Sequence, residues 1–141
     1  MFIQMNNNIL VNEVMLPVED CPVVSENTIL KEALEQMGQF KLGMCCIIDS
    51  SSKLMGILTD GDLRRKLLRS QKPLSALFVD DVLLHSIQSP IVVHPTNLLI
   101  EAVTLMDKNQ VWDLPVVDNE NNLLGVLHSH RAVAVLLGLK K

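Results

Sequence analysis

The sequence is poor in aromatic residues and in positive charge. Among 141 residues it has three Phe, one Trp and no Tyr, and its 12 Lys and Arg are outnumbered by 16 Asp and Glu, which gives a net charge of −4. Proteins that bind nucleic acid place clustered cations on the phosphates and aromatic rings on single-stranded bases. We therefore expect no nucleic acid partner.

Long apolar runs are also missing. No run in the sequence approaches the roughly 18 consecutive apolar residues of a membrane-spanning helix. The first residues, MFIQMNNN, have neither the basic start nor the apolar core of a secretion signal. We expect no membrane partner, a cytoplasmic location and a flexible lead-in over residues 1–10.

Cysteine is scarce, and its spacing predicts no bridge. Cys21, Cys45 and Cys46 fit neither a disulfide framework nor a metal-ligand spacing. The adjacent pair would point to opposite faces of a strand. We interpret all three as small apolar residues in a reducing compartment, with a redox switch as the alternative. The chain also has no P-loop and no Ser/His/Asp or Cys/His triad, and we expect no cofactor and no metal site.

What the sequence does contain is an internal repeat. With an offset of 69, residues 23–64 align with 92–133 without a gap, and ten positions are identical. A copy of about 60 residues has a thin core, so two copies are expected to pack together. The repeat predicts an α+β fold of two β-α-β-β-α units with pseudo-two-fold symmetry and related clefts between them. We divide the chain into a first repeat over 11–72 and a second over 73–141.

Each copy shows the same order of elements. The predicted strands are residues 23–24, 44–48 and 54–58 in the first copy and 91–93, 114–117 and 123–127 in the second. A helix with apolar residues at spacings of three and four follows the first strand of each copy. Asn27 or Thr28 is expected to cap the helix of the first copy. Closing helices are expected from about Asp60 and about Ser129. Trp112 is expected in the core, with the lining of a cleft or a dimer seam as the alternative.

The segment from Gly56 to Arg65 is the strongest candidate for a ligand site. It is a strand that runs directly into a helix start, where free backbone N–H groups and the helix dipole attract phosphate. A Thr hydroxyl can add a donor, an Asp carboxylate can accept from a sugar diol, and a glycine permits close approach. Helix capping without a ligand is the alternative. The candidate ligand-binding residues are Thr59, Asp60, Gly61, Asp62, Arg64 and Arg65.

Over roughly residues 11–138, the repeat resembles a pair of cystathionine-β-synthase-type (CBS) domains. In that family each copy ends its second hairpin strand with glycine, two apolar residues, Thr or Ser, two variable residues and Asp. Gly56, Thr59 and Asp62 match this pattern. The resemblance implies a non-catalytic ligand sensor, in which the Thr and the Asp hold the phosphate and ribose of an adenine nucleotide or a related ligand.

The second copy departs from the pattern. His128 replaces the Thr and Arg131 replaces the Asp. Because a guanidinium cannot accept hydrogen bonds from a diol, ordinary nucleoside binding is not expected there. We expect a weaker second cleft that takes an anion through His128, His130 and Arg131. The two histidines also suggest a metal, but the sequence offers no third ligand nearby.

A narrower resemblance rests on three strings. Leu42-Gly43-Met44, the run Thr59-Asp60-Gly61-Asp62-Leu63-Arg64-Arg65 and the run Gly125-Val126-Leu127-His128-Ser129-His130 are similar to the C-terminal CBS pair of the arabinose-5-phosphate isomerase family. Those enzymes interconvert ribulose 5-phosphate and arabinose 5-phosphate for Kdo synthesis in lipopolysaccharide or capsule. In that family a sugar-isomerase domain precedes the CBS pair and carries the catalytic residues, and nothing in this chain matches it.

The resemblance implies a set of partners. These are an adenine or cytidine nucleotide or a sugar nucleotide such as CMP-Kdo, an upstream sugar-isomerase domain, and a second copy in a homodimer that the apolar residues 132–139 would favour. The alternatives are the regulatory part of a sugar nucleotidyltransferase, which shares the Thr-Asp-Gly-Asp string, and a stand-alone scaffold or dimerisation module. Catalysis by the chain itself would need Asp62, His128 or His130 as acid and base.

Overall fold

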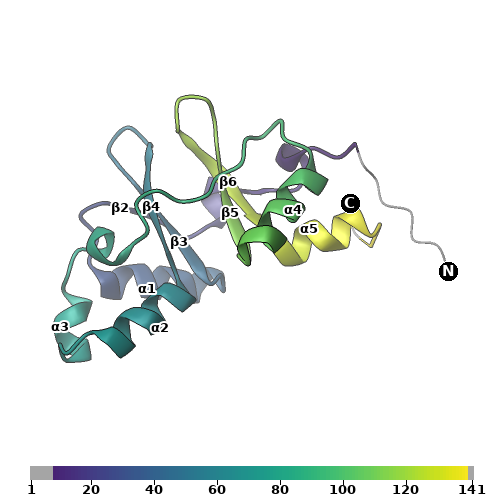
Figure 1. Cartoon of the computed structure of the whole chain (residues 1–141). Coiled ribbons are helices and arrows are strands. Elements are labelled where there is room, and N and C mark those ends of the chain that lie inside the picture. The colour runs from purple at the N-terminus through teal and green to yellow at the C-terminus, as the bar shows by residue number, and fades with distance from the viewer. Residues whose placement is uncertain (1–7, 140–141) are drawn as a thin grey trace. The chain divides into compact units, whose positions relative to one another are not determined.

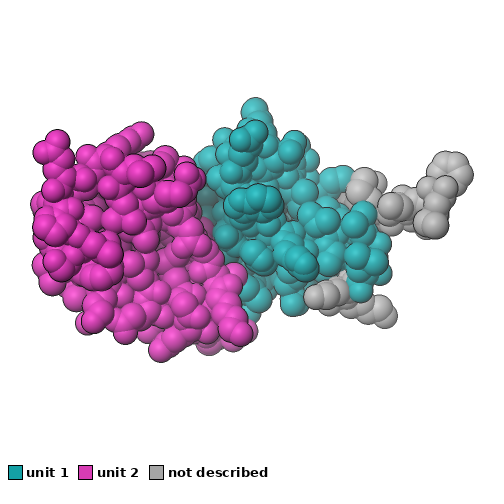
Figure 2. Space-filling model, turned by 90° about the horizontal axis from the view of Figure 1, so that it is seen from below, with its two compact units in different colours: residues 1–18, 91–141 teal, residues 19–90 magenta. Residues whose placement is uncertain are grey.

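The computed structural model describes residues 8–139, so most of the expected lead-in over 1–10 lies outside the described residues. The chain divides into two compact units, which Figure 2 colours separately. Unit 1 comprises residues 1–18 and 91–141, and unit 2 comprises residues 19–90. Each unit combines helices with a three-stranded sheet, so the predicted α+β class is confirmed. Within the described residues, no helix has the length and apolar character needed to cross a bilayer.

Unit 2 contains a sheet in the order β2-β3-β4. Strand β2 runs parallel to β3, and β3 forms an antiparallel hairpin with β4. Its elements in chain order are β2 (Val23–Ser25), α1 (Leu30–Phe40), β3 (Met44–Ile48), β4 (Leu54–Thr59), α2 (Asp60–Arg69), α3 (Leu74–Phe78) and the 3-10 helix η3 (Val82–His85) (Figure 1). A further 3-10 helix, η2 (Val18–Asp20), contains the position in the chain at which unit 1 ends and unit 2 begins.

Unit 1 repeats this plan with a sheet in the order β1-β6-β5. Its elements are the 3-10 helix η1 (Val11–Glu13), β1 (Leu16–Pro17), α4 (Leu99–Asn109), β5 (Asp113–Val117), β6 (Leu123–His128) and α5 (Ser129–Leu136) (Figure 1). The strand predicted at 91–93 is reduced to a single parallel bridge between Val93 and Val116. The other five predicted strands and the two closing helices lie where the sequence placed them.

The duplication extends to backbone details. Lys41 and Gln110, which are 69 residues apart, both end their helices in the left-handed conformation, with φ of 55° and 53°. The hairpin turns are built alike, because the carboxylates of Asp49 and Asp118 both accept hydrogen bonds from backbone N–H groups two and four residues later. The two copies therefore share a conformation and not only an order of elements.

Each sheet is completed by a short segment from the other repeat. In unit 1, Leu16 pairs with Val126 on β6. In unit 2, Ile87 and Ile57 exchange backbone hydrogen bonds of 2.8 and 2.9 Å on β4. Residues 8–18 thus join the second repeat, and residues 73–90 join the first. The compact units and the repeats divided at 72 and 73 are two different divisions of the chain.

We call residues 9–17 and 80–87 the exchanged segments. They also supply the hydrogen-bond acceptors for the first N–H groups of α1 and α4. The prediction that Asn27 or Thr28 caps α1 is wrong, because the N-cap is Ile29 and makes no side-chain capping bond. Instead the Leu30 N–H donates to the Asp80 carbonyl at 2.8 Å. In unit 1, the Leu99 N–H donates to the Ile9 carbonyl at 2.8 Å. Backbone carbonyls from outside each repeat, at Ile9 and Asp80, therefore accept from the helix starts, which local sequence does not reveal.

Each unit has its own apolar core. In unit 2, one stripe of α1 packs on the inner face of the sheet, as the spacing of three and four predicts. The buried residues of this cluster are Val24, Leu30, Ala33, Met37, Cys45, Ile47, Leu58, Leu77 and Val82. The cluster in unit 1 is Val11, Val14, Val93, Leu99, Ala102, Met106, Leu114, Val116, Leu127, Ala132, Val135 and Leu136.

Candidate functional site

The junction of β4 and α2 has the arrangement of a capped helix. Thr59 is the N-cap of α2, and its Oγ1 accepts a hydrogen bond from the Asp62 N–H at 3.1 Å. The same hydroxyl donates to Asp62 Oδ2 at 2.8 Å. A threonine cap contributes about 1 kcal/mol to a helix. Thr59 therefore caps α2, and the cap fixes its hydroxyl and the Asp62 carboxylate next to each other.

Asp62 is held from two sides. Its Oδ1 accepts a hydrogen bond from Arg65 at 2.8 Å, and its side chain is only 14% exposed. Because a carboxylate oxygen can accept two hydrogen bonds, each oxygen keeps capacity for a further donor. The guanidinium balances the charge of the carboxylate and orients it. Asp62 can therefore accept from hydroxyl groups without leaving its present partners.

The remaining predicted residues do not all join this cluster. The Asp60 N–H donates to the Gly43 carbonyl at 3.0 Å, and a side chain at Gly43 would meet Asp60 Oδ2 at 2.8 Å. A side chain at Gly61 would meet the Arg65 guanidinium at 3.2 Å, so this glycine leaves room for that arginine. Arg64 is exposed on α2.

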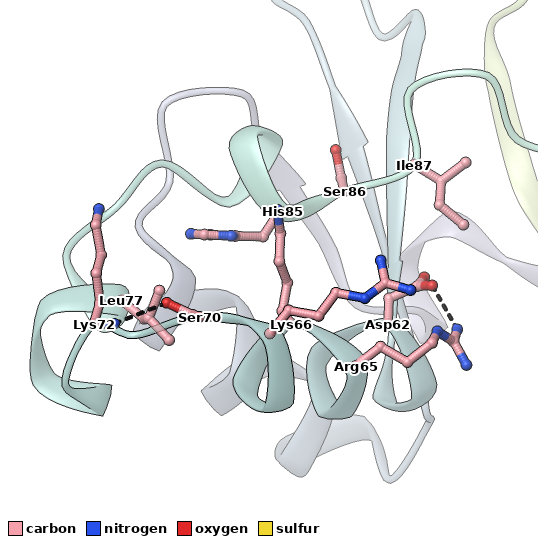
Figure 3. A pocket seen from close by; sticks show the side chains of 10 residues that line it. Asp62, Arg65, Lys66, Ser70, Lys72, Leu77, His85, Ser86 and Ile87 are labelled. Atoms are coloured by element: carbon pink, nitrogen blue, oxygen red, sulfur yellow. Dashed lines mark hydrogen bonds and ion pairs between the residues drawn. The ribbon is translucent and has the colours of Figure 1, made fainter.

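Two hollows in unit 2 take in three of the six predicted residues, whereas Thr59, Gly61 and Arg64 line neither of them. The larger, of about 470 Å³, takes in Asp62 and Arg65 and runs along α2 to the segment after η3 (Figure 3). Its lining residues are Asp62, Arg65, Lys66, Arg69, Ser70, Lys72, Leu77, His85, Ser86 and Ile87. The smaller, of about 360 Å³, is lined by Asp60, Gly43 and residues of α1 and the loop after it.

Sequence reasoning missed a polar cluster at one end of the larger hollow. His85 Nε2 lies 2.9 Å from Asp80 Oδ2, and Lys72 Nζ lies 3.5 Å from the same oxygen. The hydrogen bond from His85 lowers the pKa of Asp80, as does the charge of Lys72, and together they outweigh the opposite effect of burial. Sequence spacing does not reveal this cluster, because its residues come from three different places: Lys72 follows α2, Asp80 follows α3 and His85 ends η3.

In unit 1 the second copy uses its histidines differently. His128 Nδ1 lies 2.6 Å from Asp113 Oδ1, and the Asp113 side chain is 8% exposed. The rings of His128 and His130 stack with their centroids 6.4 Å apart. Arg131 Nε donates to the Val14 carbonyl at 2.8 Å. Sequence reasoning missed Asp113, although the hairpin register that pairs Leu114 with Leu127 also places it opposite His128.

The prediction that Trp112 belongs to the core is wrong. Its side chain is 76% exposed and lines a hollow of about 520 Å³ between α4 and α5. The seven residues that line the smaller hollow of unit 2 correspond, at an offset of 69, to seven of the eight that line this one, and the eighth is Val133. The two repeats therefore share a surface depression, which is mostly apolar in unit 1.

The cysteines are buried, and the described residues contain no metal-binding cluster. Cys21, Cys45 and Cys46 are buried, and none of the three is in a disulfide. Burial raises the pKa of the Cys45 thiol to about 12, so this thiol is not in the reactive thiolate form at neutral pH. Among the described residues, no cluster of three or more His, Cys, Asp or Glu side chains could hold a metal ion.

Taken with its duplicated units, the strand–helix junction defines the class of protein. Residues 11–69 and 79–138 match the CBS domain family, and the chain belongs to this family with two copies of the domain. CBSX2 from Arabidopsis thaliana has a similar structure, with a TM-score of 0.81, 28% identity, and coverage of 94% of this chain and 96% of that one. A structure of CBSX2 in complex with AMP gives a TM-score of 0.80 at 30% identity, covering 94% and 98%.

Curated relatives add the narrower resemblance. The chain is 35% identical over 120 residues to arabinose 5-phosphate isomerase KdsD of Escherichia coli strain K12, covering 85% of this chain and 35% of that protein. It is 30% identical over 128 residues to an uncharacterized protein of Helicobacter pylori strain J99, covering 89% and 36%. The chain thus spans about a third of the length of these relatives. The predicted tandem CBS pair and its similarity to the isomerase family are confirmed.

Proposed function

We propose that this chain is a ligand-sensing regulatory CBS pair without chemistry of its own, which binds a nucleotide or sugar nucleotide at the junction of β4 and α2. The observation that carries the proposal is Asp62, whose carboxylate is oriented by Thr59 and Arg65 and keeps free acceptor capacity. The structure of CBSX2 in complex with AMP supports an adenine nucleotide as the first candidate ligand.

The residues at the junction suggest how such a ligand is held. The positive end of α2 attracts a phosphate, and the Arg65 guanidinium adds a second positive group beside it. Asp62 accepts hydrogen bonds from the hydroxyl groups of a ribose or another sugar. Binding regulates a neighbouring domain only if the ligand prefers one arrangement of the protein over another.

The similarity to KdsD supports a place for this module within an arabinose 5-phosphate isomerase of Kdo and lipopolysaccharide synthesis in the cytoplasm. In such a protein the repeats at 11–72 and 73–141 serve as the regulatory region behind a sugar-isomerase domain. A cytidine nucleotide or CMP-Kdo is then the second candidate ligand. The regulatory part of a sugar nucleotidyltransferase and a stand-alone scaffold are the alternatives.

Calorimetric titration of the chain with AMP, CMP and CMP-Kdo tests the proposal. Asp62→Asn keeps the size of the side chain and removes the charge, and we expect it to weaken binding about tenfold or more, since hydrogen bonds to charged groups contribute about 1.5–3 kcal/mol. Glu35→Gln on the exposed face of α1 makes the same chemical change away from the junction and serves as control. Equal affinity in Asp62→Asn and wild type would reject the site.

An activity assay separates regulation from catalysis. We expect the isolated chain to leave arabinose 5-phosphate unchanged under conditions where an intact isomerase converts it. Turnover by these 141 residues would overturn the regulatory proposal. If none of the three ligands binds while the chain is folded, the scaffold alternative is favoured.

We also propose that a second copy of this chain covers the hollow beside Trp112, since exposed apolar patches mark interaction surfaces. Trp112→Glu should then shift the chain from dimer to monomer in sedimentation velocity. Val79→Glu in unit 2, also at an exposed apolar residue, is the control. A dimer that survives Trp112→Glu would contradict this part of the proposal.

A further inference from the structure

The larger hollow of unit 2 concentrates positive charge on an acidic chain. Four cationic side chains line it beside a single carboxylate, although the chain as a whole has a net charge of −4. The cations are Arg65, Lys66, Arg69 and Lys72, and the carboxylate is Asp62. Figure 3 shows α2 on one side of the hollow and the segment from His85 to Ile87 on the other. Its volume of about 470 Å³ falls within the ~300–1,000 Å³ of small-molecule pockets.

His85 gives this pocket an unmet polar group. Its side chain is only 9% exposed, and it lines the pocket. Nε2 is engaged with Asp80, whereas Nδ1 is buried and has no hydrogen-bond partner among the described residues. A buried nitrogen without a partner is destabilising, because its hydrogen bonds to water are lost and not replaced. With Asp80 ionised, Nε2 donates to it, and a protonated ring has an N–H at Nδ1 as well, ready to donate to an anion.

In unit 1, the positions that correspond to the basic residues of α2 are not basic. Shifted by 69 residues, Arg65, Lys66 and Arg69 correspond to Ala134, Val135 and Gly138. Helix α5 buries four of its residues, including the first two of these, whereas α2 buries none. The same fold position therefore carries an exposed basic helix in one unit and a core helix in the other. Packing of the CBS fold does not require the charges on α2.

We propose that this pocket binds a phosphate-rich anion, either free pyrophosphate or the polyphosphate end of a nucleotide. Lys66, Arg69 and Lys72 neutralise the phosphoryl oxygens, and a small turn of the His85 ring toward the pocket lets Nδ1 donate to one of them. The pocket shares Asp62 and Arg65 with the proposed nucleotide site and continues along α2 to Lys72 and His85. Binding of free pyrophosphate does not rest on the proposed function, whereas binding of the polyphosphate end of a nucleotide does.

Calorimetry with inorganic pyrophosphate on the whole chain tests the pocket. Lys66→Ala and Arg69→Ala should each weaken binding about tenfold or more, because each removes a charged hydrogen-bond donor. Lys31→Ala on α1 changes the net charge equally outside the pocket and should leave the affinity unchanged. Equal weakening by all three variants would show attraction by net charge alone and would overturn the proposal, as would the absence of pyrophosphate binding.

His85→Gln sharpens the test. Glutamine can still donate to Asp80 but has no counterpart of Nδ1, so we expect weaker pyrophosphate binding with little change in thermal stability. In the wild-type chain, the ring 15N signals of His85 should shift when pyrophosphate is added. Unshifted signals at saturation would overturn the role of His85, even if the variant fails to fold.

A second titration distinguishes the source of the anion. If the ligand is a free oligophosphate, ATP and pyrophosphate bind with similar affinity, and Asp62→Asn strengthens both equally because it removes a negative charge from the pocket. If it is the end of a nucleotide, ATP binds more tightly than pyrophosphate, and Asp62→Asn removes the difference. Either result supports the pocket when Lys66→Ala weakens both. Binding of AMP that survives Lys66→Ala while pyrophosphate binding is lost separates this pocket from the proposed nucleotide site.

Discussion

Asp113 and His128 face each other across the β5–β6 hairpin at the register position that Met44 and Thr59 occupy in the β3–β4 hairpin. In unit 2 the position holds a threonine that caps the following helix. In unit 1 it holds an imidazole and a carboxylate 2.6 Å apart, and His128 makes no side-chain capping bond to α5. The second copy has therefore exchanged a helix cap for a cross-strand polar pair.

This pair should contribute to the stability of unit 1. A double-mutant cycle with Asp113→Asn and His128→Gln should give a coupling energy of about 1–2 kcal/mol, because the hydrogen bond involves a nearly buried carboxylate. Urea unfolding at neutral pH measures it. A cycle between Asp113 and His130, whose ring stacks on His128, is the control and should give a smaller value. Equal coupling in both cycles would contradict the pairing.

The glycines of the two hairpins permit close packing of the exchanged segments. A Cβ at Gly56 would lie 2.8 Å from Ser86 Oγ and 2.9 Å from the Ile87 carbonyl, and a Cβ at Gly125 would overlap the Leu16 carbonyl. We expect Gly56→Ala and Gly125→Ala each to lower the free energy of unfolding by about 1–3 kcal/mol, with the larger loss at Gly125, where backbone must move. Thermal denaturation checks this.

Gly38 provides the matched control for that prediction. It lies on the exposed side of α1, and an added Cβ would meet nothing within 4 Å. Because alanine is the better helix former, Gly38→Ala should raise the free energy of unfolding by up to about 1 kcal/mol. If all three substitutions changed stability in the same direction, the close approach at the hairpins would not be the cause.

The Cys45 thiol should be inert in the folded chain. Its pKa of about 12 keeps it protonated, and only the thiolate is reactive. We expect little alkylation of Cys45 by iodoacetamide at about pH 8 in buffer and rapid alkylation in urea, with the site identified by mass spectrometry. Since the unfolded thiol ionises near 9, stability should also fall as the pH rises above that value. Alkylation at the same rate in buffer and urea would favour the redox-switch interpretation.

Acid should weaken unit 2 through Asp80. Its carboxylate is favoured in the folded state, so its pKa lies below the ordinary 3.8. The stabilisation is therefore present above that value and is lost as the pH falls through the lower pKa of the folded protein. Asp80→Asn should be less stable than wild type at about pH 6, and the difference should shrink toward about pH 3. A difference that does not depend on pH would exclude this linkage.

The internal repeat and the spacing of apolar residues were sufficient to predict most of the helices and strands. The offset of 69 located both copies, and β3 begins and ends where the sequence placed it. Local sequence could not show that Asp80 and Ile9 supply the carbonyls at the helix starts, because those contacts come from segments far along the chain. For the same reason the sequence did not reveal which segment completes each sheet.

The candidate site was predicted less completely. The spacing of Thr59 and Asp62 implied that they meet, because a helix start brings residues three apart together. His85 and Lys72 could not be placed in the same hollow as Asp62, since the loop after α2 and the helix η3 bring them there. Trp112 was misplaced because a large apolar residue in the loop between α4 and β5 carries no local mark of which side it faces.

The exchange of edge segments has a consequence for dissecting this protein. An expression fragment that stops at residue 72 would lose Ile87 from β4 and the carbonyl of Asp80 from the start of α1. Its complement would lack Leu16 on β6 and Ile9 at the start of α4. Neither half carries all the backbone partners of its own sheet and helix. Separately produced halves should therefore misfold or aggregate alone. They should recover their structure only when they are mixed, because the N-terminal segment of each half pairs with the sheet of the other.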